Sequence, residues 1–309
     1  MSAGARYVGR FAPSPTGPLH LGSLLAAVGS FLDARSRGGR WLVRIEDLDS
    51  PRVVPGSADL ILRTLEAFGL TWDGAVEYQS RRTERYQAAL EALLARGFTF
   101  QCSCSRRDLA DAEERGYPGT CRNGPTRPGP SAWRFRIDDQ AVVQFDDRIQ
   151  GPQAFALRQL GDVIVRRRDG LIAYQLAVTV DDAAQGITDV VRGADLLDST
   201  AWQIAITGAL GCQPPRFAHL PLVVEPDGSK LAKSRRSAPV DSLRAAASLA
   251  ATLALLGQDP PAELRRQPPP TQLEWAIGHF RIAPLQGVRT VPAPEQILQI
   301  DLGASPGVY

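Results

Sequence analysis

The stretch APSPTGPLHLGS, Ala12 to Ser23, decides the fold of the first part of the chain, because it joins a predicted strand at 7–11 to a predicted helix at 21–35. At such a junction, backbone N–H groups and the helix dipole form a site for an anion, and an imidazole can add a hydrogen bond to phosphate. Gly22 lets a ring approach closely because it has no side chain. His20 and Gly22 therefore predict a nucleotide site, and a Pro/Gly turn with an exposed histidine is the alternative.

Strand and helix patterns alternate from residue 7 to residue 97, which predicts a parallel α/β sheet. A second strand is expected at 40–49, and amphipathic helices are expected at 56–70 and 81–97. From residue 98 to about residue 168 the chain is rich in Cys, Pro, Gly and Arg, which indicates an insertion.

Beyond the insertion, the chain returns to core-forming patterns. Asp169-Gly170 joins two apolar runs and predicts a β-hairpin that carries the chain back into the buried core. Helices are expected at 193–210, after Pro239, and at 272–280.

Composition is that of an ordinary soluble globular protein, with 309 residues, 44% hydrophobic content and a net charge of +2. No apolar run approaches the ~20 residues of a membrane span, and the N-terminus lacks a signal-peptide core, so we expect a cytoplasmic protein without a membrane partner. Only two of the 35 basic residues are lysine, Lys230 and Lys233 in GSKLAKSRRS. Because lysine offers a compact ammonium on a flexible stem, this bias indicates a specific role for both; chance composition is the alternative.

Arg10 and Glu46 end the first two predicted strands, at the edge where an open α/β sheet binds its ligands. A small zwitterion with an additional carboxylate needs one buried acid for its ammonium and arginines for its carboxylates. Together with Arg192, these residues predict a glutamate site, whereas each of them alone would be interpreted as part of a surface ion pair.

Cys102 and Cys104 form a Cys-x-Cys pair, and Cys121 follows after 16 intervening residues; Cys212 stands apart as an ordinary small buried residue. Cytoplasmic thiols stay reduced, so three cysteines in a loop-rich insertion predict zinc in preference to a disulfide, with incidental free thiols as the alternative. The segment has no histidine, so the fourth ligand would come from Tyr117, Asp108, Asp111, Glu113, Glu114 or water.

The chain carries, in order, four motifs that resemble those of the glutamate-specific class I aminoacyl-tRNA synthetases: RFAPSPTGPLHLGS, RIEDLD, VDDAAQGITDVVRGADLL and GSKLAKS. HLGS stands where that class has its HIGH motif and KLAKS where it has KMSKS. The sequence is most similar to truncated paralogues of glutamyl-tRNA synthetase. Only about 75 residues follow KLAKS, the HIGH-like motif ends in Ser23, and the cysteine segment looks like the paralogues' zinc site.

The resemblance implies a Rossmann-like α/β catalytic domain whose halves, 1–97 and 171–223, flank a zinc-bearing, acceptor-like insertion at 98–170. A KMSKS-like loop and a truncated helical stem-contact region would occupy 224–309. The family's glutamate site falls on Arg10, Phe11, Ala12, Pro13, Ser14, Glu46, Tyr174 and Arg192.

For the remaining groups, the resemblance implies that His20 and Gly22 meet ATP, that Lys233 contacts its phosphates, and that Lys230 completes the catalytic set. Mg²⁺ would accompany ATP through the phosphates. One structural Zn²⁺ would be held by Cys102, Cys104, Tyr117 and Cys121.

The activity that this resemblance implies is tRNA-independent activation of L-glutamate to glutamyl-adenylate, followed by transfer to the queuosine cyclopentenediol at the wobble position of tRNA(Asp). We expect a monomer that binds ATP, L-glutamate and the anticodon arm of tRNA(Asp), with phosphate contacts from Arg106-Arg107, Arg166 to Arg168 or Arg235-Arg236. The alternatives are a compact glutamyl-tRNA synthetase that charges a tRNA 3′ end, a non-catalytic synthetase-like protein that binds RNA or an amino acid, and a small-molecule adenylyltransferase.

Overall fold

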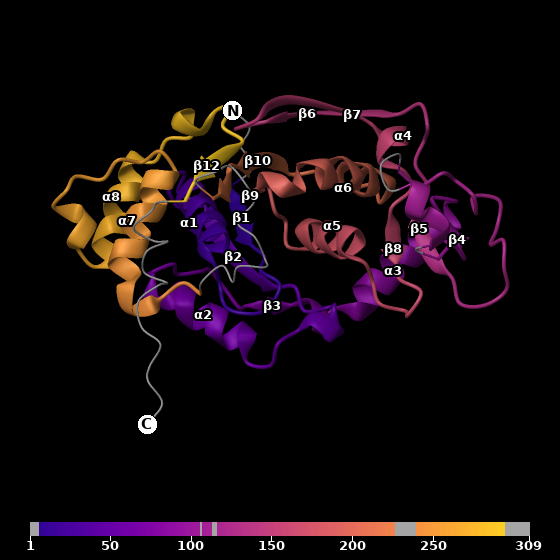
Figure 1. Ribbon diagram of the computed structural model, residues 1–309, viewed down its shortest axis with the longest axis horizontal. Coiled ribbons are helices and arrows are strands. Elements are labelled where there is room, and N and C mark those ends of the chain that lie inside the picture. Colours follow the sequence, from indigo (N-terminus) through magenta and orange to yellow (C-terminus); the bar gives the residue numbers. More distant parts are fainter. Residues whose placement is uncertain (1–5, 106, 113–115, 226–238, 294–309) are drawn as a thin grey trace.

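The computed structural model describes residues 6–105, 107–112, 116–225 and 239–293. Three regions follow one another along its longest axis (Figure 1): the C-terminal helices α7 (Ala245–Leu255) and α8 (Pro269–His279), the central sheet, and the cysteine-rich segment around β4 (Thr99–Cys102) and β5 (Ala132–Phe135). No helix in these ranges is long and apolar enough to cross a membrane.

The central sheet has the strand order of a Rossmann-like fold. β1 (Val8–Phe11), β2 (Arg40–Ile45) and β3 (Glu77–Tyr78) are parallel neighbours in that order. On the other side of β1 lies β9 (Asp189–Gly193), which pairs in parallel with β10 (Arg216–Leu220). The strand order therefore reverses between β1 and β9, and open α/β sheets bind ligands at such a switch point.

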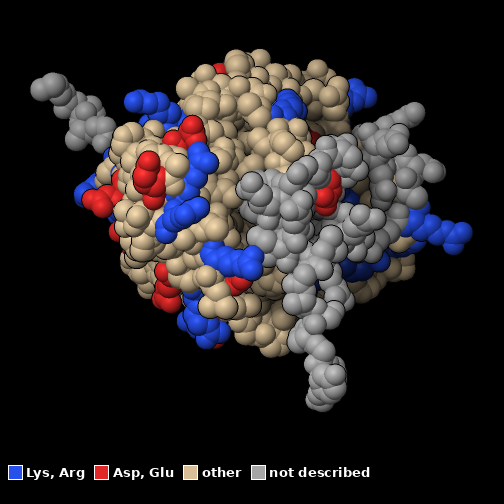
Figure 2. All heavy atoms as spheres, turned by 60° about the vertical axis from the view of Figure 1, so that its left-hand side comes forward, with Lys and Arg blue, Asp and Glu red and all other residues tan. Residues whose placement is uncertain are grey.

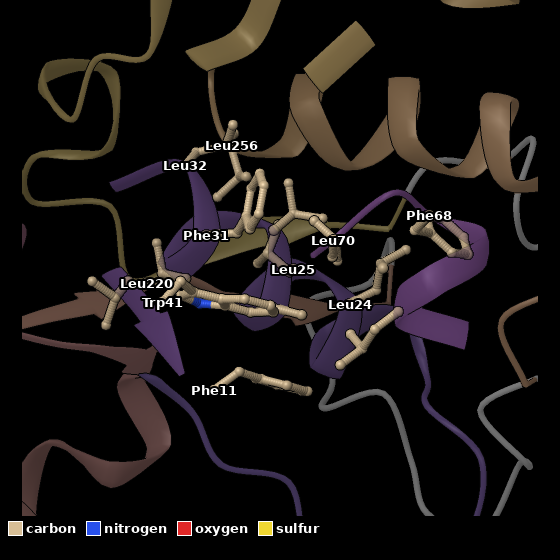
Figure 3. Packing of buried hydrophobic residues seen from close by; sticks show 14 of the residues in the cluster. Phe11, Leu24, Leu25, Phe31, Leu32, Trp41, Phe68, Leu70, Leu220 and Leu256 are labelled. Atoms are coloured by element: carbon tan, nitrogen blue, oxygen red, sulfur yellow. The ribbon is translucent and has the colours of Figure 1, made fainter. Parts of the chain in front are cut away.

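Helix α1 (Leu21–Arg35) is the centre of the main hydrophobic core (Figure 3). The fully buried Trp41 ring packs edge-on against Phe31, with the ring centroids 5.2 Å apart. Its indole N–H donates to Ser30 Oγ at 3.0 Å. α1 has a glycine where it meets β10, because a Cβ on Gly29 would lie 2.7 Å from Leu220 Cδ1. Helix α2 (Ser57–Ala67) adds Ile61 to this core, and α7 and α8 contact α1 from the C-terminal end.

A second core lies among α3 (Thr83–Ala95), α5 (Tyr174–Ala184) and α6 (Leu197–Ala209). Here the hairpin prediction is wrong in part. The chain turns at Asp169-Gly170 after β8 (Ile164–Arg166), but only the bridge from Arg166 to Ile172 forms, and the second apolar run is helix α5. Helix α5 is mostly buried, and the apolar run of a buried helix is not distinguished from a strand by periodicity alone. The helix expected at 193–210 likewise begins only at Leu197, because residues up to 193 complete β9.

The predicted insertion contributes to two sheets. β4, β5 and β8 form an antiparallel sheet, and α4 (Leu157–Leu160) precedes β8. The hairpin of β6 (Val142–Asp147) and β7 (Gly151–Ala156) instead pairs with β10, where Asp147 is opposite Phe217. Residues from the insertion thereby reach the central sheet. At the opposite end, β11 (Leu222–Val224) pairs with β12 (Thr290–Pro292).

Candidate active site

A cleft of about 820 Å³ opens at the switch point between β1 and β9. It is large enough for a nucleotide and a small second substrate, since ligand pockets typically span ~300–1,000 Å³. Most of the residues predicted to bind glutamate and ATP line it: Arg10, Phe11, Ala12, Pro13, Ser14, His20, Gly22, Tyr174 and Arg192. Glu46 adjoins this lining, because its N–H donates to the Pro13 carbonyl at 2.9 Å. Lys230 and Lys233 lie outside the described residues.

The opening loop ends at His20, which caps helix α1. Its Nδ1 accepts from the Ser23 N–H at 3.3 Å, and its Nε2 lies 3.0 Å from Ser23 Oγ, so the ring covers the first helical turn. A Cβ on Gly22 would lie 3.2 Å from two atoms of that ring. Any larger residue at this position would push the imidazole away from the helix N-terminus by a few tenths of an ångström.

Arg10 is held by a buried carboxylate that it shares with a second arginine. Asp182 accepts from Arg10 Nε at 3.3 Å and from Arg44 Nη1 at 2.8 Å, and Arg44 Nη2 also donates to Glu46 at 3.2 Å. Burial opposes ionisation of Asp182, but the two arginines outweigh it and lower the pKa of Asp182. Burial dominates at Glu46 and raises its pKa. A ligand cation beside Glu46 would favour the ionised carboxylate.

Arg192 has a different environment, because no carboxylate in the described part of the chain pairs with it. Arg192 is 5% exposed, and within the described residues its guanidinium donates only to neutral acceptors: His219 Nε2 at 3.2 Å, Tyr174 Oη at 3.3 Å, the Leu196 carbonyl at 3.3 Å and Thr200 Oγ1 at 2.7 Å. Burial lowers the pKa of Arg192. A buried cation without a counter-charge is costly, and a ligand carboxylate in the cleft would offset that cost.

Four buried residues behind the cleft escaped the sequence-based prediction: Arg44, Asp147, Asp182 and His219. Arg44 and His219 stand within strands whose other residues are mostly apolar. A charged or titratable residue in a buried strand needs a polar partner. The occurrence of Arg44 and His219 within apolar strands was therefore the signal in the sequence that pointed to them. The partners could not be identified from the sequence, because Gln185 lies 141 residues from Arg44 and Asp147 lies 72 residues from His219.

The three predicted cysteines form one cluster, whose sulfur atoms all lie within 4.8 Å of one another. Cys104 Sγ and Cys121 Sγ are 3.5 Å apart. The Tyr117 hydroxyl lies 3.3 Å from Cys102 Sγ and 3.8 Å from Cys104 Sγ, so it occupies the fourth corner. Three thiols and a phenol in this arrangement could bind a metal ion. The sulfur–sulfur distances are close to the spacing of about 3.8 Å between two sulfur ligands of a tetrahedral zinc ion.

The electrostatics of the cluster favour the thiolate of Cys121 over that of Cys104. Burial opposes ionisation of Cys121, but hydrogen bonds from the backbone of Ser103 and Thr126 lower its pKa to about 6. Burial raises the pKa of Cys104 to about 11. Of the other proposed fourth ligands, Asp108 is engaged by the Ser105 N–H at 2.7 Å and by Arg127.

Of the arginines considered for RNA contacts, Arg107 and Arg166 to Arg168 belong to the described residues. Arg168 donates to the Ser103 and Cys104 carbonyls, both at 2.9 Å, so it ties the turn after β8 to the cysteine cluster. Arg167 pairs with Asp49 and Asp169. On the face shown in Figure 2, which includes the end with α7 and α8, basic and acidic side chains intermingle. Arg106, Arg235 and Arg236 lie outside the described residues.

Comparisons with known proteins agree with this geometry. The profile of the tRNA synthetases class I (E and Q), catalytic domain, matches residues 7–247. Glutamyl-Q tRNA(Asp) synthetases from Aromatoleum aromaticum and Thiobacillus denitrificans are 52% and 53% identical, over 93% and 94% of this chain and 93% and 99% of the relatives. A crystal structure of a glutamate tRNA ligase from Elizabethkingia meningosepticum, in complex with its amino acid, superposes with a TM-score of 0.78 at 26% identity, over 96% of this chain and 68% of that chain. The chain therefore belongs to the class I tRNA synthetases for glutamate and glutamine, and among them to the family of glutamyl-Q tRNA(Asp) synthetases.

Proposed function

We propose that this protein activates L-glutamate with ATP and transfers the glutamyl group to the queuosine cyclopentenediol at the wobble position of tRNA(Asp). The observation that carries the amino-acid part is Arg192, a buried guanidinium at the cleft that donates only to neutral acceptors in the described chain. An amino acid with a side-chain carboxylate supplies the missing charge. The names of the relatives, glutamyl-Q tRNA(Asp) synthetases at 51–53% identity, support the RNA part.

In this proposal, the glutamate site comprises Arg10 to Ser14, Glu46, Tyr174 and Arg192. Glu46 binds the ammonium, since a cation would relieve the raised pKa of its buried carboxyl. Arg10 and Arg192 bind carboxylates, and their supports differ: Asp182 neutralises Arg10, whereas Arg192 keeps its full charge for the ligand. The two arginines would therefore contribute unequally to affinity.

ATP would bind with its phosphates near His20, Gly22 and the first turn of α1, and Lys230 and Lys233 would stabilise the charge that develops as pyrophosphate leaves. Class I synthetases use ATP with Mg²⁺, which binds mainly through the phosphates. The glutamate α-carboxylate, already ionised at neutral pH, attacks the α-phosphorus and forms glutamyl-adenylate with release of pyrophosphate. A cyclopentenediol hydroxyl then attacks the carbonyl carbon, loses its proton, and AMP leaves with the electron pair.

We further propose that Cys102, Cys104, Tyr117 and Cys121 bind one structural zinc, because soft thiolates at tetrahedral spacing suit that ion. The acceptor-like insertion, 98–170, would then dock the tRNA(Asp) anticodon arm where a full synthetase docks an acceptor stem. Arg107 and Arg166 are candidate phosphate contacts within the described residues, and substituting them should flatten the salt dependence of RNA binding without loss of glutamate activation.

The test is transfer of radiolabelled glutamate, with ATP, to tRNA(Asp) that contains or lacks queuosine, followed by nuclease digestion. We expect label on the queuosine nucleoside and none on the unmodified tRNA. Label on a terminal adenosine would instead identify a compact charging synthetase, the alternative favoured by the similarity to glutamate tRNA ligases. Absence of glutamate-dependent ATP–pyrophosphate exchange would refute the first step.

A further inference from the structure

His219 lies beneath Arg192 with all of its polar contacts made inside the protein. Both His219 and Asp147 have fully buried side chains. The imidazole Nδ1 lies 2.6 Å from Asp147 Oδ2, and Nε2 faces Arg192 Nε at 3.2 Å and Thr200 Oγ1 at 3.1 Å. Arginine can only donate, so Nε2 must be the unprotonated acceptor and the proton must reside on Nδ1.

Asp147 fixes this tautomer from the other side. Its Oδ1 accepts three backbone N–H groups, from Ile149 at 3.0 Å, Gln150 at 2.8 Å and His219 at 3.1 Å. Burial opposes ionisation of Asp147, but the hydrogen bond with His219 lowers its pKa, so Oδ2 is an acceptor. A carboxylate here demands a proton on Nδ1, which leaves the Nε2 lone pair to Arg192.

We propose that Asp147 and His219 are positioning residues for glutamate activation, which hold Arg192 with Nε turned inward and Nη1 at Tyr174, open to the ligand carboxylate. This inference rests on the proposed function, because it assigns Arg192 to glutamate. The role is distinct from charge neutralisation, since neutral His219 leaves the full charge of Arg192 available. It also gives the β6–β7 hairpin a part in amino-acid binding.

Asp147→Asn separates the positioning role from a structural one. The three backbone donors keep the amide oxygen on their side, so the amide NH₂ faces His219 Nδ1 and shifts the proton to Nε2. Two donors, Nε2–H and Arg192 Nε–H, then oppose each other. In ATP–pyrophosphate exchange we expect the KM for glutamate to rise about tenfold or more while the KM for ATP stays unchanged.

His219→Gln and His219→Asn form the matched pair. Gln can place its Oε1 where Nε2 lies and accept from Arg192, whereas Asn reaches only the Nδ1 position. The His219→Gln variant should therefore keep a glutamate KM within a few-fold of the wild-type value, whereas His219→Asn should raise it further. The sequence has three histidines, so their imidazole signals can be resolved in ¹⁵N spectra. The wild-type His219 ring should show the Nδ1–H tautomer.

The inference is overturned if Asp147→Asn leaves both KM values unchanged, or if His219 is protonated at Nε2 in the wild type. Equal changes in both KM values, with a lower melting temperature, would reduce the pair to a structural role and also overturn it. Failure of the proposed function is recognised separately, because wild-type protein would then show no glutamate-dependent exchange before any variant is tested.

Discussion

Replacing Arg192 by lysine keeps the positive charge and removes the planar fork. Arg192 serves four acceptors from three nitrogen atoms, and a single ammonium cannot reach all four. The Thr200 hydroxyl, 3.1 Å from His219 Nε2, can turn to satisfy that ring. At least one buried acceptor still loses its donor, at a cost of about 2 kcal/mol in the free energy of unfolding.

The same substitution should weaken glutamate binding, because a lysine ammonium lacks the hydrogen bonds to His219, Leu196 and Thr200 that hold Nη1 at the cleft. We expect the KM for glutamate to rise about tenfold to a hundredfold in ATP–pyrophosphate exchange, since each tenfold is worth about 1.4 kcal/mol. Stability would be measured by urea unfolding. Arg216→Lys is the control: Arg216 lies on the neighbouring strand β10 and pairs with Asp189 at 2.8 Å, but its side chain is 60% exposed. It should change the free energy of unfolding by less than about 0.5 kcal/mol. If Arg192→Lys keeps the wild-type stability and glutamate KM, the reasoning about Arg192 is refuted.

Three other perturbations test separate parts of the protein. Cys104→Ser should abolish zinc binding, measured by metal analysis, and lower the melting temperature. The control Cys212→Ser should retain the metal. Equal metal contents in the two variants would exclude the proposed ligand set. Gly22→Ala brings a Cβ to 3.2 Å from the His20 ring and should raise the KM for ATP several-fold. The control Gly278→Ala has open space around its Cβ and should leave the KM for ATP unchanged. Identical ATP kinetics in the two variants would argue against a nucleotide at the N-terminus of α1. Burial opposes ionisation of Asp33, but the hydrogen bonds and charge of Arg148 lower the pKa of Asp33 in the folded protein. A lowered folded-state pKa adds stability at pH values above the unfolded-state pKa. This stability is lost as the pH falls through the folded-state pKa. The free energy of unfolding should therefore decrease below about pH 4 in urea titrations, and less steeply in Asp33→Asn; parallel curves would contradict this assignment.

The parts of the fold that could be predicted from sequence are those with local causes. Helix α1 has the predicted bounds, because a Pro/Gly loop precedes it and a glycine pair follows it. The cysteine cluster was also predictable, since Cys102 ends strand β4 and Cys104 follows it by two residues. Strand β2, expected to extend to residue 49, ends at Ile45, because the acidic residues that follow bind other groups: Asp47 accepts from Ser80, and Asp49 pairs with Arg52.

The parts that could not be predicted depend on which strands become neighbours. The sequence indicates that Arg10 and Glu46 end adjacent strands, but nothing local to Arg44 indicates that Asp182 will lie between it and Arg10. Similarly, β6 lies in the insertion by sequence order, yet it pairs with β10. Helix α5 was misassigned because its β-branched residues favour a strand locally, whereas packing between α3 and α6 selects the helix.

The β6–β7 hairpin links the insertion, through Asp147 and His219, to Arg192, the residue proposed to bind glutamate. A chimera that exchanges residues 98–170 with those of a paralogue replaces Asp147 as well as the segment proposed to contact RNA. Acceptor choice and amino-acid affinity are then inherited together, unless the graft leaves the hairpin in place. Divergence of this protein toward a new RNA would accordingly be expected to proceed through β4, β5 and the cysteine cluster, while β6 stays under the selection that acts on Arg192.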